Sequence, residues 1–493
     1  MAWRPKGGRR IWAGKDWLCV TSALGNKWVR TDELVGIRWV IDGHISMRDR
    51  EGRKLIVKPS DLRENPELLR VVAAAVQRSV EPVWCSPSCC ASSSASTRPE
   101  TDSGRAKEWG AMVRRMLPLV VAVLVAGVLA APARAIGSFG PPVTVTDPPC
   151  EFDAYNVDLA QDTAGVAHGF ADLWGSACNT TFRIDYFQGA GASWTRETTP
   201  YRGFVVAVAW DATGTYLLYV DAAGLGLRIT KRLANGTYTG GRLLSTRTGP
   251  DGSLAQGDVV ATGGQWWAVW REHVAANGGP GDEFDQTELF QAYSIGGPLH
   301  GRQRITNTAA WDSAPSLART PAGTFPLTLV WARGGSDFGA NPADLRRALG
   351  SAGGTWSSSS FATAGELNFW PDVKVVGTTT FVTWNRDGRT VAADNAGGAF
   401  TTSHTFGTAA SQSNPPRVGI SGGNVFVGWT TPPAGGPARA FVAKRVGGSW
   451  TGGYASPAAA TALQFLQGVA PRGGKATAVI LSLGSRLYAT SER

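Results

Sequence analysis

The stretch DVVATGGQWWAVW (Asp258–Trp270) contains one complete unit of the pattern that decides the fold. A strand of small and β-branched residues leads into a glycine turn. An apolar strand that ends in a large side chain follows the turn. Because glycine readily adopts the positive φ of tight hairpin turns, the stretch predicts two antiparallel strands.

The same pattern recurs along the C-terminal part of the chain. The copies are DLAQDTAGVAHGF (Asp158–Phe170, degenerate), VAVAWDATGTYLLYV (Val206–Val220), PSLARTPAGTFPLTLVW (Pro315–Trp331), PDVKVVGTTTFVTW (Pro371–Trp384), PRVGISGGNVFVGW (Pro416–Trp429) and GVAPRGGKATAVI (Gly468–Ile480). We call the large residue that ends each copy a core anchor; these are Phe170, Tyr219, Trp270, Trp331, Trp384, Trp429 and Ile480. Repeats of about fifty residues with four short strands each are typical of propeller blades.

A second motif follows most core anchors, namely a glycine turn that leads to an aromatic residue. It occurs as GAGASW (Gly189–Trp194), ANGTY (Ala234–Tyr238), AGGTW (Ala352–Trp356), AGGAF (Ala396–Phe400) and VGGSW (Val446–Trp450). Its position and form resemble the Asp-box turn of sialidase-like propellers, S-x-D-x-G-x-T-W, although the Ser and Asp are largely missing. The resemblance covers roughly residues 155–493 and implies a propeller fold, with the aromatic packed between blades.

The predicted fold class is therefore all-β, a seven-bladed propeller in residues 136–493. Six blades are the alternative if Asp158–Phe170 is not a true blade. The last unit has only about three strands before Arg493, and Pro141–Thr146 is expected to complete it and remove an exposed sheet edge. Cys150 lies just after that strand and is predicted to form a disulfide with Cys178, since these are the only cysteines beyond residue 134.

Residues 112–135 (MVRRMLPLVVAVLVAGVLAAPARA) have the layout of a secretory signal, with Arg114 and Arg115, an apolar run and a final A-x-A. Export with cleavage before Ile136 is the first interpretation, and Met112 or Met116 is then the true start. In the alternative, Leu117–Ala131 stays uncleaved as a single membrane anchor, and the propeller lies outside the cell.

Residues 1–81 predict a different module. Short β-type runs are expected at Trp17–Thr21, Lys27–Arg30, Val35–Ile41, His44–Arg48 and Lys54–Val57, followed by a helix from Pro66 to about Val80. This small α+β unit resembles the pleckstrin-homology-like modules of actinobacterial proteins. Residues 82–111 are Ser-rich and predict a disordered linker.

Most of the excess positive charge of the chain lies in the residues up to the end of the predicted signal. Residues 1–134 hold 22 Lys and Arg against 13 Asp and Glu, and residues 135–493 hold 26 against 25. The nearly neutral propeller gives no electrostatic case for binding nucleic acid.

Two sets of residues are candidates for ligand binding. Arg271, Arg333 and Arg386 follow three consecutive core anchors and could clamp a carboxylate, as the resemblance to sialidases implies. Trp266 and Trp311 lie outside the core-anchor register and are candidates for an exposed sugar-stacking surface.

Two long acidic loops are candidates for a Ca²⁺ site. Arg271–Glu288 carries Asp282, Glu283, Asp285 and Glu288, and Ala332–Asp344 carries Asp337 and Asp344. Carboxylate oxygens are ligands that Ca²⁺ prefers. The spacing of these acidic residues is not that of an EF-hand loop, so the alternative interpretation is that the protein binds no cofactor.

No catalytic set emerges from the sequence. Glu272 and Asp387, beside two of the arginines, are the acid candidates, and His168 and His273 lie far apart with no G-x-S-x-G motif nearby. The predicted function is binding of a glycan or a cell-envelope protein. The alternatives are a divergent sialidase-like glycoside hydrolase and a membrane-anchored sensor with a cytoplasmic pleckstrin-like head.

Overall fold

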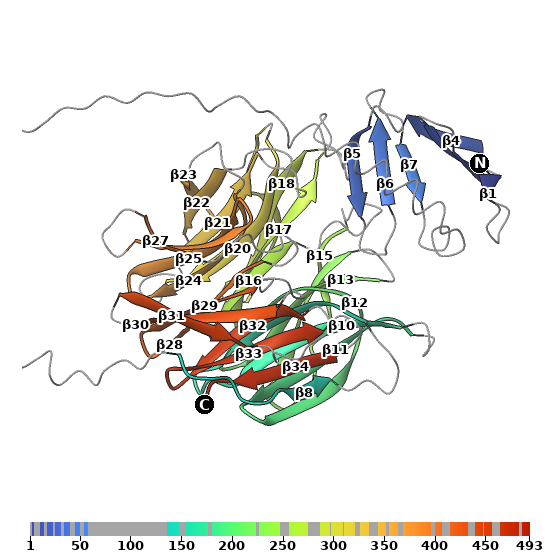
Figure 1. Cartoon of the computed structure of the whole chain (residues 1–493). Coiled ribbons are helices and arrows are strands. Elements are labelled where there is room, and N and C mark those ends of the chain that lie inside the picture. The colour runs from blue at the N-terminus through green and yellow to red at the C-terminus, as the bar shows by residue number, and fades with distance from the viewer. Residues whose placement is uncertain are drawn as a thin grey trace, which may run out of the picture.

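The structure is a computed structural model of the whole chain (Figure 1). The described residues are 136–146, 153–175, 180–222, 226–246, 256–274, 286–295, 297–308, 310–320, 326–334, 344–351, 354–362, 368–395, 400–406, 415–431, 439–446, 448–455, 464–482 and 486–493, together with the strands between residues 2 and 57. All regular structure in this part of the chain is β-strand. Within it no helix is long and apolar enough to cross a bilayer, and Leu117–Ala131 lies outside it.

The N-terminal strands form two small antiparallel sheets. The first contains β1 (Ala2–Trp3), β2 (Arg10–Ala13), β3 (Trp17–Ser22) and β4 (Gly25–Arg30), and the second contains β5 (Leu34–Trp39), β6 (Ile45–Asp49) and β7 (Lys54–Val57). The five predicted β-runs therefore correspond to β3–β7. The predicted helix, linker and signal lie outside the described residues, and the pleckstrin-like resemblance stays a prediction.

The first propeller sheet has seven strands in the order β15-β14-β13-β12-β11-β10-β9. They are β9 (Asp153–Gln161), β10 (Ala167–Gly175), β11 (Thr180–Ala190), β12 (Ser193–Asp211), β13 (Gly214–Asp221), β14 (Leu227–Leu233) and β15 (Arg242–Ser245). The two halves of β12 pair with different strands: Ser193–Arg202 with β11 and Gly203–Asp211 with β13. At Gly203 (φ 144°) a Cβ atom would lie 1.8 Å from the carbonyl oxygen of Val220, so only glycine fits this junction.

Four-stranded antiparallel sheets follow in chain order. They are β16 (Gly257–Thr262), β17 (Gln265–His273), β18 (Thr287–Ser294) and β19 (Leu299–Arg304); β20 (Asp312–Arg319), β21 (Leu327–Arg333), β22 (Asp344–Gly350) and β23 (Trp356–Ala362); β24 (Asn368–Val376), β25 (Thr379–Arg386), β26 (Arg389–Asp394) and β27 (Thr401–Phe406); β28 (Arg417–Ser421), β29 (Asn424–Thr431), β30 (Arg439–Val446) and β31 (Ser449–Tyr454).

The last sheet joins the two ends of the propeller. It contains β32 (Gln464–Arg472), β33 (Lys475–Ser482), β34 (Arg486–Ser491) and, as its outer strand, β8 (Val143–Thr146). The strand expected at Pro141–Thr146 therefore pairs with the C-terminal strand, as predicted. Figure 1 shows the C-terminus beside this segment.

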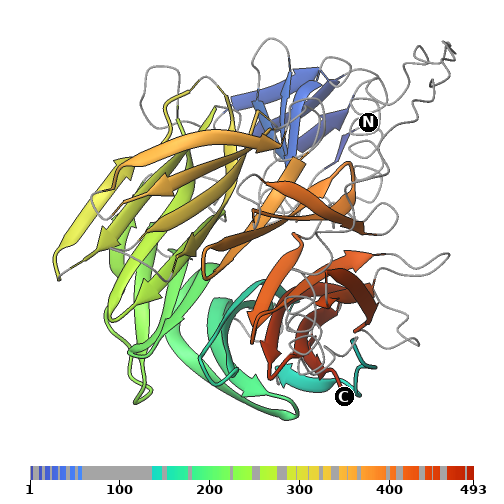
Figure 2. The ribbon, with the colours of Figure 1, turned by 90° about the vertical axis from the view of Figure 1, so that its left-hand side faces the viewer.

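The innermost strands surround one axis (Figure 2). Contacts run from β9 to β12, β16, β20, β24, β28 and β32, and β32 contacts β9 again. Such a ring of antiparallel sheets is a β-propeller.

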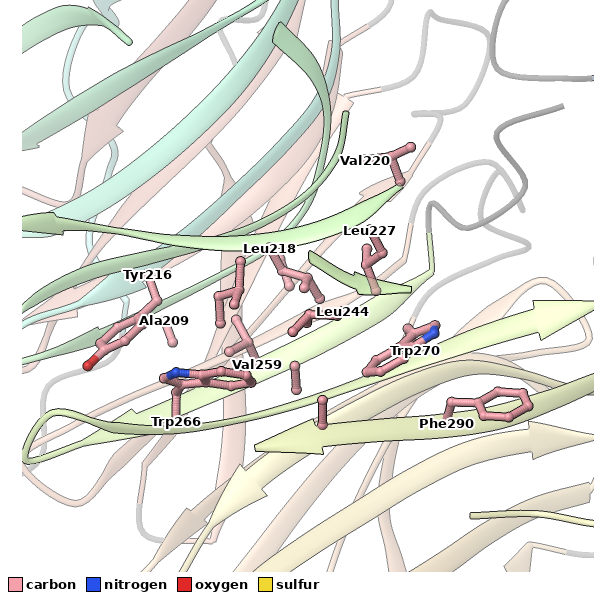
Figure 3. Close-up of a cluster of buried hydrophobic side chains, with 14 of the residues drawn as sticks. Ala209, Tyr216, Leu218, Val220, Leu227, Leu244, Val259, Trp266, Trp270 and Phe290 are labelled. Atoms are coloured by element: carbon pink, nitrogen blue, oxygen red, sulfur yellow. The ribbon is translucent and has the colours of Figure 1, made fainter. Parts of the chain in front are cut away.

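The hydrophobic core lies between neighbouring sheets. In β17, Trp266 and Trp270 pack toward the sheet of β13 (Figure 3), whereas Trp267 packs toward the sheet of β21. Both faces of the strand are buried because side chains alternate and each sheet lies between two others. The core anchors with described side chains are at most 4% exposed, which confirms that they are core residues; they are Phe170, Tyr219, Trp270, Trp331, Trp384 and Trp429.

The aromatic residues of the glycine turns also pack between sheets. Each is a partly buried member of a hydrophobic cluster between two sheets or, for Tyr238, between the two halves of the seven-stranded sheet; they are Trp194, Tyr238, Trp356, Phe400 and Trp450. The packing that the Asp-box resemblance implied is confirmed.

Ring closure depends on β8, which gives a first prediction. Val145 is 5% exposed and lies in the cluster that joins the last sheet to the first, while Thr144 points to solvent from the same strand. Val145→Asp buries an unpaired carboxylate and is expected to lower the free energy of unfolding by about 3 kcal/mol. Thr144→Asp is the matched control and should change it by less than about 1 kcal/mol. Equal effects in urea unfolding would contradict the closure described here.

Candidate functional site in the axial channel

A cavity of about 410 Å³ lies on the propeller axis and is lined by residues from every innermost strand. This volume is within the range of small-molecule sites, which is about 300–1,000 Å³. The polar members of its wall are Asp158, Gln161, Asp258, Ser316, Arg319, Asp372, Lys374, Arg417 and Gln467.

Five of the polar side chains come from one position of the repeat. Asp158, Asp258, Ser316, Asp372 and Arg417 occupy equivalent positions in the quoted copies and lie in the innermost strands β9, β16, β20, β24 and β28, respectively. The repeat therefore brings these side chains to one level of the channel. The quoted copies contain this polar position, but the sequence alone does not show that it faces the axis.

Most of these side chains also tie one innermost strand to the next. The carboxylates of Asp158, Asp258 and Asp372 accept hydrogen bonds of 2.7 Å from backbone N–H groups of the next innermost strand around the axis. The donors are Val208, in the second half of the same seven-stranded sheet, and Leu317 and Val418, each in the next sheet. Ser316 Oγ accepts from the N–H of Val373 at 3.1 Å in the same way.

Ser316 also links two of the carboxylates. Its hydroxyl lies 3.1 Å from Asp258 Oδ2 and 3.4 Å from Asp372 Oδ1. A hydroxyl has one proton to donate, so it can serve only one ionised carboxylate at a time. When Asp258 carries a proton, both contacts can be hydrogen bonds, and the three groups form one chain.

Burial and the neighbouring charges in the channel shift the pKa values of its ionisable side chains. Burial raises the pKa of Asp258 to about 6, an effect that the Lys374 ammonium and the Leu317 N–H oppose in part. Burial also raises the pKa of Asp158, against the opposing effect of Arg417. Burial by itself would lower the pKa of Lys374, but the carboxylates of Asp372, Asp258 and Asp158 outweigh it and raise that pKa.

Two cations balance the carboxylates. Lys374 Nζ lies 3.7 Å from Asp372 Oδ1, and Lys374, whose side chain is 46% exposed, lines the cavity. Arg417 Nη2 lies 3.9 Å from Asp158 Oδ1. The channel thus offers hydroxyl, carboxylate, ammonium and guanidinium groups together, which suits a small ligand with many hydroxyl groups rather than one of a single charge.

The predicted arginine clamp does not form. Arg333 and Arg386 lie two residues after their core anchors, whereas Arg271 lies one residue after Trp270 and so points to the opposite face of its strand. Arg271 is 2% exposed, and Arg333 makes a bidentate ion pair with the fully buried Asp312, at 2.7 and 3.1 Å. The prediction of three guanidinium groups at one rim is wrong because the strand alternation separates them.

The tryptophan candidates are also placed by the structure. Trp266 is 7% exposed and belongs to the core between β13 and β17, so the expected exposed stacking surface is wrong for this residue. Trp311 is half-buried, and its ring meets that of His273 edge-on at 6.2 Å. A ligand role for Trp311 stays a prediction.

Most of the predicted Ca²⁺ ligands, Asp282, Glu283, Asp285 and Asp337, lie outside the described residues. Glu288 is described and fully buried; it accepts hydrogen bonds from Arg304 at 2.9 Å and from the N–H of Thr308 at 2.7 Å. Asp344 pairs with Arg346 at 3.1 Å. In the described ranges no three His, Cys, Asp or Glu side chains are grouped so that they could hold a metal ion.

The acid candidates named from the sequence have other roles. Glu272 is fully buried and accepts from Trp270 Nε1 at 2.7 Å, from Ser245 at 2.8 Å and from Arg302 at 2.6 Å. Asp387 is exposed and has a positive φ of 48° in the turn between β25 and β26. Cys150 and Cys178 lie outside the described residues, and their disulfide stays a prediction.

No protein-family model and no curated protein matches the sequence. Among solved structures, the chain is similar to an α-L-arabinofuranosidase from Fusarium graminearum (11% identity, TM-score 0.43, 72% of this chain and 98% of that one). It is also similar to an α-L-arabinanase from Penicillium chrysogenum (10%, TM-score 0.40, 72% and 98%) and to a Trypanosoma rangeli sialidase (11%, TM-score 0.38, 72% and 59%). The chain thus spans about three fifths of that sialidase. A sialidase is among the similar structures, as the repeat motif predicted, and the likeness concerns the fold alone.

The pKa of Asp258 predicts a pH dependence of stability. Because this pKa is raised from 3.8 to about 6 on folding, the protonated form is favoured in the native state. The stabilisation is complete below about pH 4 and is lost as the pH rises through about 6, by about 3 kcal/mol in all. Asp258→Asn should remove this slope in urea unfolding between pH 4 and 7. A variant with the slope of the unaltered chain would show that Asp258 titrates normally.

The arginine after Trp331 gives a stability prediction. Asp312→Ala leaves Arg333 and the indole N–H of Trp331, which donates to Asp312 at 2.8 Å, without their acceptor. The free energy of unfolding should fall by about 3 kcal/mol. Arg386→Ala, whose contact to Thr405 is 3.5 Å and exposed, should cost less than about 1 kcal/mol. If Arg333 had no structural role, the two variants would lose about the same, small amount of stability.

Proposed function

We propose that residues 136–493 form an exported, seven-bladed propeller that binds a glycan in its axial channel. The observation that carries the proposal is the ring of polar side chains at one level of the channel, contributed by strands far apart in the sequence. Sugars present hydroxyl groups that donate to carboxylates and accept from ammonium and guanidinium groups. A cavity of about 410 Å³ is a better fit for one or two sugar rings than for part of the surface of an envelope protein.

The blade count and the export are part of the same proposal. The ring of innermost strands supports seven blades. In this count β9 is the innermost strand of the first blade, and the second half of β12 is the innermost strand of the second. Ile136 supports cleavage just before it, because this residue itself contacts the propeller. Its N–H donates to Thr451 at 3.1 Å, and the N–H of Gly137 donates to Glu492 at 2.7 Å.

A glycan microarray with the purified chain tests the binding function. The chain should bind at least one class of oligosaccharide, and Asp372→Asn should weaken binding at least tenfold, since it removes a charged acceptor. Thr144→Asp, on the outer edge of the propeller, should bind normally. If Asp372→Asn binds as the unaltered chain does, the site is not in the channel.

A glycoside hydrolase is the second candidate, and the Asp258–Ser316–Asp372 chain favours it. The two carboxylate oxygens contact one hydroxyl at 3.1 and 3.4 Å, so they lie no more than about 6.5 Å apart. Retaining glycosidases use two carboxyl groups about 5.5 Å apart, one of them with a raised pKa. With its pKa near 6, Asp258 would be the proton donor and Asp372 the nucleophile.

Release of 4-nitrophenol from a panel of 4-nitrophenyl glycosides separates the two functions. A hydrolase would show activity that falls above about pH 6, as Asp258 loses its proton, and that Asp258→Asn reduces at least a hundredfold. Sugar binding without release at any pH between 4 and 8 supports the binding module.

A further inference from the structure

The channel wall contains one aromatic side chain among the residues described there, Trp210. It lies at the end of β12, three residues after Ala207, whose place in the repeat matches that of Asp258. Gln161, Ala261, Arg319, Val375 and Ile420 occupy the same position in other copies and also line the cavity. Together these residues form one end of the channel, next to the turns that join each first strand to the second.

Trp210 is half-buried and is supported from behind. The ring of His168 stacks on it at a centroid distance of 6.0 Å and an interplanar angle of 21°. His168 is fixed in turn, because Nδ1 lies 2.6 Å from the hydroxyl of Tyr186 and Nε2 lies 3.4 Å from Asp162 Oδ2. A platform held in this way loses little conformational entropy when a ligand binds.

The neighbours of Trp210 at this end are mixed in chemistry. Val375 and Ile420 are aliphatic, while Gln161 and Arg319 offer an amide and a guanidinium. Gln161 Nε2 donates to the carbonyl of Pro471, so its amide oxygen is positioned to accept. One apolar ring face with hydrogen-bonding groups beside it matches a pyranose, which has C–H bonds on its faces and hydroxyl groups around its edge.

We infer that Trp210 is the stacking platform of the glycan site, and that a pyranose at a chain end enters the channel from the Trp210 end. This inference rests on the proposed function and names its substrate class and direction of entry. Trp210 takes the role that the sequence suggested for Trp266 and Trp311, and Asp258 and Asp372 lie deeper in the same channel.

Calorimetric titration of the full chain with cellobiose, lactose, chitobiose and arabinobiose at millimolar concentrations tests the inference. At least one of the three pyranose disaccharides should bind, and arabinobiose, built of pentoses, should bind more weakly. Trp210→Ala should weaken binding at least tenfold. Trp194→Ala removes a half-buried tryptophan that does not line the channel and should leave binding unchanged.

Trp210→Phe keeps an aromatic ring and guards against a folding defect. It should retain binding within about tenfold of the unaltered chain, because a smaller ring still stacks. The change in tryptophan fluorescence that the disaccharide causes in the unaltered chain should disappear in this variant, an effect that a merely structural role would not produce.

The outcomes separate the two claims. If Asp372→Asn loses binding while Trp210→Ala keeps it, the glycan function stands and the Trp210 platform is wrong. If both variants bind like the unaltered chain, or if no pyranose disaccharide binds it, both claims are overturned.

Discussion

The pairing of β8 with β34 is the interaction on which the rest of the structure depends. A propeller has no free sheet edge only when its two ends meet, and here the outer strand of the last sheet comes from the other end of the domain. Glu492 reinforces the closure, because its carboxylate accepts from the N–H groups of Gly137 and Ala476 at 2.7 and 3.0 Å. Closure holds the innermost strands in a ring, and the ring creates the channel.

The channel is also part of what holds the ring together. Asp158, Asp258, Ser316 and Asp372 each accept from the backbone of the next innermost strand, so the candidate site and the bonds between innermost strands share atoms. Such groups are costly to bury unless they are hydrogen-bonded. The raised pKa of Asp258 shows that part of this cost remains, as is common at functional sites. Stability and ligand recognition are therefore expected to be coupled in this protein.

The sequence predicted the fold well because the repeat is a local pattern. Glycine turns and apolar strand ends lie within about fifteen residues of each other. The predicted strand at Pro141–Thr146 belongs to no copy of the repeat and so could be assigned to the incomplete last unit. The candidate site was predicted poorly because it depends on register. Arg271 and Arg333 look equivalent in the sequence, but one residue of offset turns them to opposite faces. The partners of Trp331 and Arg333 could not be found either, because Asp312 lies in another strand about twenty residues away.

The central claim is that the ligand occupies the axis rather than the outer loops. A crystal structure of the chain with a bound disaccharide tests it most directly. The account predicts a sugar ring against Trp210, with its hydroxyl groups within hydrogen-bonding distance of the Asp258, Asp372 and Lys374 side chains. A sugar bound only by residues of the segments 275–285 and 335–343, with none in the channel, would contradict it.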